Sequence, residues 1–166
     1  MKIFNEKPIL KFRKGENTAD LFLFKRKIIR FLVNGIGMVP SPKWNRAKIP
    51  AFYLNNKLEL LVLRGYFDTD GSIVITNNNG TIYPRLEAKI SPSPMQKQFI
   101  GILKRNRFNF IVQNIGKGKI RVRLNGEHQL KDWYYKVGFS NPRYLKRAKR
   151  FVTVSPHTSC VIQVFY

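Results

Sequence analysis

The stretch that decides the fold reads Leu63-Arg64-Gly65-Tyr66-Phe67-Asp68-Thr69-Asp70-Gly71. Together with the apolar residues just before it, this stretch predicts a helix that starts near Asn56 and ends at Gly71, a residue suited to a helix C-terminus. The small residues Gly65 and Thr69 are four positions apart, so they share one face of the helix. We expect another backbone to approach closely on that face.

Asp68 and Asp70 place two carboxylates in the last turn of the expected helix. The C-terminal end of a helix carries partial negative charge, so an anion there lowers stability unless a cation lies near it. A divalent metal ion would supply that cation, because Mg²⁺ is held by one or two carboxylates together with phosphate oxygens. A simpler interpretation stays open at this point, because Asp and Gly are also common turn residues.

The overall charge of the chain is strongly positive. It has 166 residues with 31 Lys plus Arg and 9 Asp plus Glu, a formal net charge of +22, and 43% of its residues are hydrophobic. Such a chain can bury a core and still present a surface for a polyanion. Nucleases, ribosomal proteins and other DNA- or RNA-binding modules share this balance, so the charge indicates the class of partner and not the activity.

Several other classes of protein are excluded or disfavoured. No apolar stretch reaches membrane-spanning length, and the first residues, Met1 to Lys14, show no export signal. The single cysteine, Cys160, excludes an intramolecular disulfide and a cysteine zinc cluster, and His128 and His157 lack partners at metal-ligand spacing. No glycine-rich phosphate loop is present. We expect an intracellular protein that is neither secreted nor embedded in a membrane.

The remaining pattern predicts an α+β fold. Residues 8–14 predict a short strand, and a helix is expected from Thr18 to about Asn34. Beyond the central helix we expect strands at 72–76 and 82–91, a helix from Pro94, strands at 109–114 and 119–124, and helices at 129–137 and 142–151. The tail from Cys160 to Tyr166 alternates weakly like a strand. Residues 57–151 then form an antiparallel sheet covered on one face by helices.

Alternation along these strands gives the sheet one cationic face. The other face is apolar, as in Ile120, Val122 and Leu124 of the second hairpin. A solvated outer face is the ordinary alternative, but five cations to one anion favour nucleic acid as the ligand. The expected DNA-binding residues are Ser72, Thr76, Tyr83, Arg85, Glu87, Lys89, Lys117, Lys119, Arg121 and Arg123.

Residues 63–71, followed by Ser72-Ile73, resemble the signature of the LAGLIDADG homing endonucleases. The order of elements over residues 57–151 resembles the αββαββα unit of that family. Residues 48–52 resemble the entry to the motif helix in archaeal and intein-type members, and residues 138–142 resemble their closing segment. The sequence departs from the usual motif at Arg64 and Tyr66, which are bulkier than the small or aliphatic residues found there.

The resemblance implies a saddle in which two motif helices pack side by side and two sheets straddle the DNA major groove. Because one motif is visible, it implies a homodimer or a degenerate second half. Residues 1–35 resemble the hairpin-and-helix end of a preceding unit. We therefore divide the chain into residues 1–50, an N-terminal strand and helix segment with a linker, residues 51–155, the endonuclease domain, and residues 156–166, a C-terminal tail.

The activity that the resemblance implies is sequence-specific cleavage of double-stranded DNA with Mg²⁺ or Mn²⁺. Asp70 then maps to the metal-binding carboxylate, with the carbonyl of Thr69 as a further ligand. Lys146 is the candidate catalytic lysine, with Lys89 as the second choice, and Gln96 could position water. The alternatives are a catalytically inactive DNA-binding regulator, an intron RNA maturase and a ribosomal or structural RNA-binding protein.

Asp68 maps to a position of the motif that is more often concerned with the helix ends than with chemistry. The two motif residues Gly65 and Thr69 map to the interface between the two motif helices.

Overall fold

A four-stranded antiparallel sheet forms the centre of the protein, whose structure, a computed structural model, describes residues 7–15, 19–55 and 57–152. The strand order is β3-β4-β6-β5. The strands are β3 (Gly71–Asn78), β4 (Thr81–Ile90), β5 (Ile111–Asn114) and β6 (Ile120–Asn125). The α+β class and both predicted hairpins are confirmed.

The turn between β3 and β4 explains the register of the longer hairpin. Asn79 and Gly80 have φ angles of 50° and 87°, so both adopt the left-handed conformation that a two-residue hairpin turn of this kind requires. The side-chain oxygen of Asn77 accepts a hydrogen bond of 2.9 Å from the Gly80 backbone amide. This turn sets Ser72 opposite Glu87 further down the ladder.

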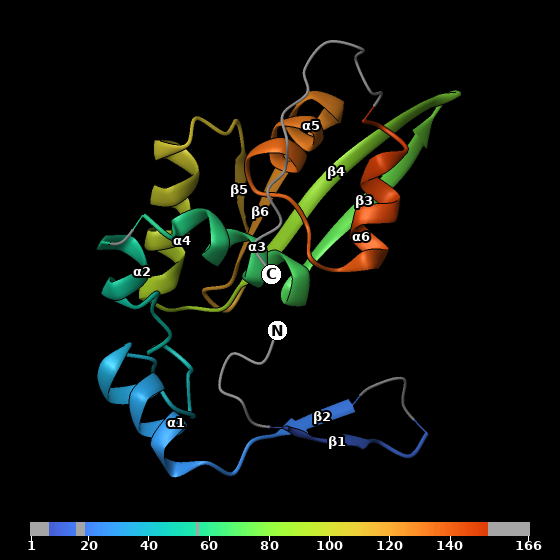
Figure 1. The fold of residues 1–166 in the computed structure, drawn as a ribbon. Helices are drawn as coiled ribbons and strands as arrows, with labels where there is room; N and C mark the ends of the chain where they lie inside the picture. The colour runs from blue at the N-terminus through green and yellow to red at the C-terminus, as the bar shows by residue number, and fades with distance from the viewer. Residues whose placement is uncertain (1–6, 16–18, 56, 153–166) are drawn as a thin grey trace.

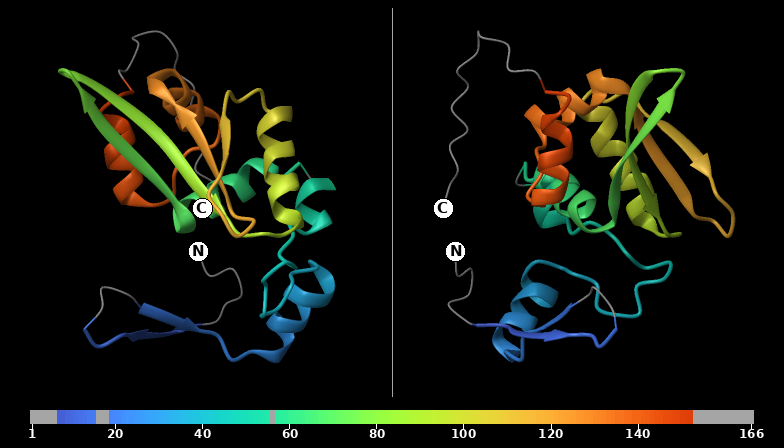
Figure 2. Two further views of the ribbon diagram at one scale, coloured as in Figure 1. Left: turned by 180° about the vertical axis from the view of Figure 1, so that it is seen from behind. Right: turned by 90° about the vertical axis from the view of Figure 1, so that its right-hand side faces the viewer.

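Four longer helices cover one face of the sheet, as Figure 2 shows in its right-hand view. They are α3 (Glu59–Asp70), α4 (Pro94–Arg105), α5 (Gly126–Lys136) and α6 (Pro142–Lys149). The core between helices and sheet is almost free of polar side chains and includes Leu63, Phe67, Leu86, Ile90, Phe99, Leu103, Val122, Leu130 and Trp133. None of the described helices combines the length and the apolar character that crossing a membrane requires.

The end of α3 requires a glycine for steric reasons. Gly71 has an extended conformation (φ −85°, ψ 172°), so the left-handed conformation expected of a C-terminal glycine is not its reason. A Cβ atom at this position would lie 2.5 Å from the carbonyl oxygen of Phe67 and 2.5 Å from its ring. The helix can therefore pass directly into β3 because residue 71 has no side chain. The short helix α2 (Ala51–Asn55) precedes α3.

The N-terminal segment differs from its prediction. Residues 19–22 form β2 (Ala19–Phe22), which pairs antiparallel with β1 (Ile9–Phe12), where a helix was expected. The helix α1 (Arg26–Arg30) begins only after this hairpin and continues as the π-helical turn η1 (Phe31–Gly35). Arg13 and Asp20 join the two strands through hydrogen bonds of 3.0 and 2.9 Å. Figure 1 shows the hairpin and α1 apart from the four-stranded sheet.

Three expectations concern residues outside the described part of the chain. They are the helix start at Thr18, the position of His157 and the strand from Cys160 to Tyr166.

Candidate nucleic-acid interface and carboxylate site

The face of the sheet opposite the helices carries most of the predicted DNA-binding side chains. Directly paired residues of an antiparallel ladder lie on the same face. The pairs Thr76 with Tyr83, Ser72 with Glu87, Glu87 with Arg123 and Lys89 with Arg121 therefore define one surface that crosses β3, β4 and β6. The opposite face holds Leu86, Ala88 and Ile90, which are buried, so the predicted alternation is confirmed.

A cluster of three arginines surrounds Glu87 at the centre of this surface. The Nε atoms of Arg85, Arg123 and Arg121 lie 2.6, 3.2 and 3.8 Å from the carboxylate oxygens. The Glu87 side chain is 10% exposed and each arginine side chain is 26% exposed. The contacts lack hydrogen-bond alignment, so they are ion pairs. The carboxylate therefore holds the three guanidinium groups together, and the cluster keeps an excess of positive charge.

Side chains of α3 attach the motif helix to the elements around it. The Nε atom of Arg64 donates a 2.5 Å hydrogen bond to the carbonyl of Val137 at the end of α5, and the Tyr66 hydroxyl donates one of 2.7 Å to the carbonyl of Lys89. The two bulky departures from the motif thus connect α3 to α5 and to β4.

Asp68 has a structural role at the start of α6. One of its carboxylate oxygens accepts a hydrogen bond of 2.7 Å from the backbone amide of Ser140. Its own carbonyl accepts one of 3.3 Å from the side chain of Asn141, the N-cap residue of α6. Asp68 therefore joins the C-terminal end of the motif helix to the N-terminal end of α6.

Asp70 is an exposed carboxylate in the last turn of α3, and this turn contains no basic residue. Its one hydrogen bond within the described part of the chain comes from the hydroxyl of Thr69, at 3.2 Å, and it has no ion-pair partner there. The negative end of the helix and the carboxylate therefore reinforce each other. This position has the electrostatic character of a cation site.

Tyr66 supplies a neutral hydrogen-bond donor next to Asp70. Burial, and to a smaller extent the negative charge of Asp70, raises the pKa of the Tyr66 phenol to about 12. The phenol therefore stays protonated at neutral pH and keeps its bond to the Lys89 carbonyl. Through this bond the end of α3 and the end of β4 are held at a fixed separation.

A cavity of about 490 Å³ opens beside Asp70. Tyr66 and Asp70 form one wall, Lys89 and Ser91 at the end of β4 form a second, and Ser93 and Met95 at the start of α4 continue it. The remaining wall comes from the linker of residues 38–50, including Lys43, Trp44 and Lys48. The structure thus brings two of the predicted site residues, Asp70 and Lys89, to one cavity.

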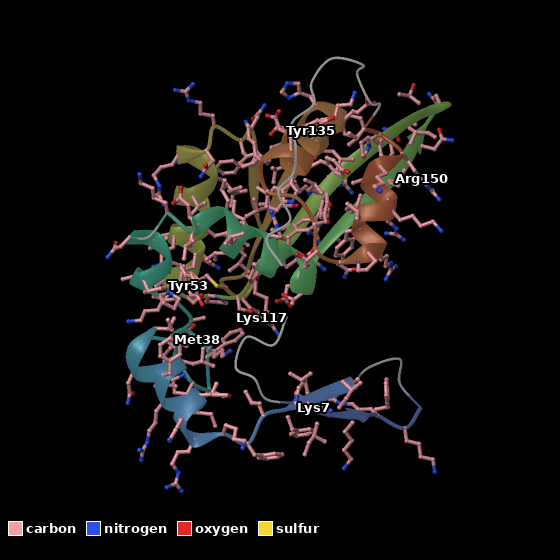
Figure 3. All side chains as sticks on the ribbon, viewed as in Figure 1. Lys7, Met38, Tyr53, Lys117, Tyr135 and Arg150 are labelled. Carbon is pink, nitrogen blue, oxygen red and sulfur yellow. The ribbon has the colours of Figure 1, made fainter. Side chains whose placement is uncertain are left out.

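Two other predicted catalytic residues lie elsewhere. The side-chain amide of Gln96 donates hydrogen bonds of 3.1 and 2.9 Å to the carbonyls of Ile90 and Gly118, so it holds the end of β4 against the β5–β6 turn. Lys146 is exposed on α6 and does not line the cavity. Lys117 lies in the β5–β6 turn with φ 52°, at the end of the core that faces the N-terminal segment (Figure 3).

The comparisons with known proteins give partial structural similarity. No protein-family model matches the chain, and no curated protein matches it. The homing endonuclease I-CvuI, in complex with an I-CreI target and with Mg, is 16% identical with a TM-score of 0.45 over 59% of this chain and 70% of that chain. The same endonuclease with its own target and Ca gives 18% and 0.44 over the same shares. The homing endonuclease I-TnaI gives 14% and 0.41 over 55% and 67%.

Proposed function

We propose that this protein is a sequence-specific double-stranded DNA endonuclease that hydrolyses phosphodiester bonds with a divalent metal ion. Residues 51–155 form its endonuclease domain, and two chains act together. The observation that carries the proposal is the position of Asp70. It is an exposed carboxylate at the negative end of a helix, with no ion-pair partner among the described residues, and it shares one cavity with Lys89 at the edge of an arginine-rich sheet face.

The residues at this position fit a hard divalent cation such as Mg²⁺ or Mn²⁺. Within the described part of the chain no group of three His, Cys, Asp or Glu side chains could enclose a metal ion. An ion held by one carboxylate therefore needs further oxygen ligands, and Mg²⁺ ordinarily takes these from phosphate and water. Asp70 and the carbonyl of Thr69 would hold it, together with Asp70 of a second copy.

The chemistry at this position follows from charge. A bound divalent ion supplies a more acidic water and stabilises negative charge on the departing oxygen. Lys89 contributes a positive charge beside the phosphodiester, and Tyr66 keeps α3 and β4 in place through its hydrogen bond to the Lys89 backbone. The protein residues thus bind and orient the strand next to Asp70.

One face of α3 is open to a second copy. Leu61, Gly65 and Thr69 recur every four residues on this face and are exposed. A Cβ atom at Gly65 would meet no atom of the described residues within 4 Å. The Thr69 hydroxyl has a single proton, which it can donate either to the helix carbonyls of Gly65 and Tyr66, at 3.2 and 3.0 Å, or to the Asp70 carboxylate, at 3.2 Å. Because small side chains permit a short interaxial distance, two such helices could bring two Asp70 carboxylates together.

The cationic sheet face accounts for recognition of the duplex. Arginine can reach the O6 and N7 atoms of guanine in the major groove, and the remaining cations can contact phosphates. A surface that neutralises six phosphates implies a log–log salt slope of roughly −5. Strong salt dependence of binding is therefore expected.

A cleavage selection tests the proposed function. The full chain is incubated with a randomised DNA duplex library and Mg²⁺ or Mn²⁺, and the new ends are sequenced. Asp70→Asn is expected to lower the cleavage rate at the selected site by at least about 100-fold, because even outer-shell partners of a metal change activity 10–100-fold. Asp132→Asn is the matched control, since Asp132 is a half-buried carboxylate on α5 that is already paired with Lys136.

Retained duplex binding by Asp70→Asn, together with loss of cleavage, would support the endonuclease. Cleavage by Asp70→Asn at the rate of the control would remove Asp70 from the mechanism. Binding without cleavage by the unmodified chain would instead identify a DNA-binding regulator. Splicing activity on intron RNA without duplex cleavage would identify a maturase.

A further inference from the structure

The linker of residues 38–50 is attached to the sheet-containing core by backbone hydrogen bonds. The amide of Asn45 donates to the carbonyl of Pro92 at 3.0 Å, and the amide of Met95 donates to the carbonyl of Ala47 at 3.0 Å. The side chain of Gln98 both accepts from the amide of Ile49, at 2.7 Å, and donates to its carbonyl, at 3.1 Å. The linker is therefore a fixed wall of the cavity beside Asp70.

The side chains that this wall contributes differ from those of the motif helix. Lys43 and Lys48 line the cavity on the linker side, and both are exposed. With Lys89 they bring three cations to a space whose lining contains one anion, Asp70. Such an excess of positive charge fits an anionic ligand, and lysine amines bind phosphate oxygens as point charges.

The same wall carries a large aromatic surface. Trp44 lines the cavity and is 54% exposed, and the Nζ atom of Lys119 lies 5.8 Å from the centre of its ring. An exposed indole next to lysines suits nucleic acid, whose bases stack on aromatic rings. Met38, which also lines the cavity, lies between α1 and the core (Figure 3).

We propose that the linker is a second part of the DNA-binding site: Lys43 and Lys48 bind a phosphate of the strand whose phosphodiester lies at Asp70, and Trp44 stacks on a neighbouring base. This inference rests on the proposed function and adds a contact that the sheet face does not make. The cavity volume of about 490 Å³ is in the range of sites for ligands of nucleotide size.

A phosphate-bearing nucleic-acid strand explains the cavity better than a small apolar ligand does. The linker wall carries two lysines, and the wall from β4 and the start of α4 carries Lys89 and two serine hydroxyls. Trp44 offers a flat surface beside them. Phosphate alone would use the lysines but would leave the exposed part of the indole uncovered. A nucleotide unit uses both, because its backbone is anionic and its base is aromatic.

The two tryptophans of the chain allow a direct measurement. Trp133 is fully buried and Trp44 is exposed, so iodide quenching of the tryptophan fluorescence reports on Trp44. The full chain is titrated with a short DNA duplex of mixed sequence in EDTA, which permits binding without cleavage. Bound DNA is expected to reduce iodide quenching to the level of the Trp44→Phe variant.

A pair of charge-matched variants separates the linker from the general positive charge. The double variant Lys43→Gln/Lys48→Gln is compared with Lys104→Gln/Lys149→Gln, whose exposed lysines lie on α4 and α6. Each lost phosphate contact lowers the log–log salt slope by about 0.9. Because Lys43 and Lys48 share one phosphate, the linker variant is expected to lose at least about tenfold in affinity near 0.1 M salt and about 0.9 in slope, while the control stays close to the unmodified chain.

The outcomes distinguish this inference from the proposed function. If the protein cleaves DNA but Trp44 stays open to iodide and both double variants bind alike, the linker contact is refuted and the endonuclease stands. If Trp44 is protected and the linker variant binds weakly while no cleavage occurs, the linker contact stands and the endonuclease fails. Protection of Trp44 by RNA and not by DNA would overturn the assignment of the partner.

Discussion

Replacement of Glu87 by glutamine removes the negative charge that holds the arginine cluster of the sheet face. The carboxylate lies 2.6, 3.2 and 3.8 Å from the Nε atoms of Arg85, Arg123 and Arg121. At an effective dielectric constant of about 20 these separations correspond to gross attractions of about 6, 5 and 4 kcal/mol. Desolvation of the carboxylate and repulsion among the three guanidinium groups oppose most of this sum.

The net effect can be set between two known limits. Exposed ion pairs contribute up to about 1 kcal/mol, and breaking a buried pair costs about 3–5 kcal/mol. Glu87 is 10% exposed and its partners are 26% exposed. We expect Glu87→Gln to lower the free energy of unfolding by about 2 kcal/mol and the Tm by about 6 °C.

Urea unfolding of Glu87→Gln and Glu127→Gln provides the assay and its control. Glu127 undergoes the same change of charge, but it is 52% exposed and pairs with Lys131 one helical turn away, at 2.7 Å. Its replacement should cost no more than about 0.5 kcal/mol. The penalty at Glu87 should shrink at 1 M salt, where screening acts over about 3 Å. Equal losses in the two variants, or a Glu87 penalty that grows with salt, would refute this account of the cluster.

Three further predictions concern the motif helix and the glycine that follows it. The Tyr66 phenol has a pKa of about 12 against an ordinary 10.0, so its contribution to stability is complete below pH 10 and is lost between pH 10 and about 12. Tyr66→Phe should lower the free energy of unfolding by about 1 kcal/mol at pH 7, and the variant should lack the loss of stability between pH 10 and about 12. Urea unfolding measured across this pH range tests both effects. Identical pH profiles for the variant and the unmodified chain would contradict the prediction. Gly65→Ala should raise stability by about 0.5–1 kcal/mol while weakening self-association measured by sedimentation. Gly71→Ala should lower stability by about 1–3 kcal/mol, because its Cβ would lie 2.5 Å from Phe67 atoms; equal effects of the two alanines would contradict this steric difference.

Most of the fold beyond residue 57 could be predicted from the sequence, because its signals are local. Alternation predicted the buried and exposed faces of β4 and β6, and Asn79 with Gly80 supplied the backbone conformation of the hairpin turn. The N-terminal strand β2 was missed because its apolar residues also fit a helical period. The structure pairs Asp20 with Arg13 across seven residues, and the spacing of apolar residues does not reveal such a pairing.

The candidate site was predictable only in part, since it depends on contacts between distant segments. The position of Asp70 at the end of a helix followed from the motif, and the presence of Lys89 in the same cavity is a tertiary result. Gln96 has its amide committed to two backbone carbonyls, which no sequence pattern indicates. The linker residues Trp44 and Lys48 were not selected, because their place beside Asp70 depends on hydrogen bonds to α4 and the residues before it.

The contacts of Glu87 likewise could not be predicted from the sequence. Alternation placed it correctly on the cationic face, where it was expected to contact DNA as a polar side chain. The structure surrounds its carboxylate with three arginines, which alternation did not indicate, because the register of β6 brings Arg121 and Arg123 alongside it. Register between strands that are distant in sequence is not encoded in the alternation of either strand.

Electron paramagnetic resonance of Mn²⁺, titrated into the full chain with the selected DNA duplex, tests the role of Asp70 most directly. We expect bound Mn²⁺ at a stoichiometry that requires two chains, and loss of that bound fraction in Asp70→Asn, with Asp132→Asn unchanged. An Asp70→Asn protein that binds as much Mn²⁺ on DNA as the unmodified chain would contradict the assignment of this carboxylate as the metal ligand.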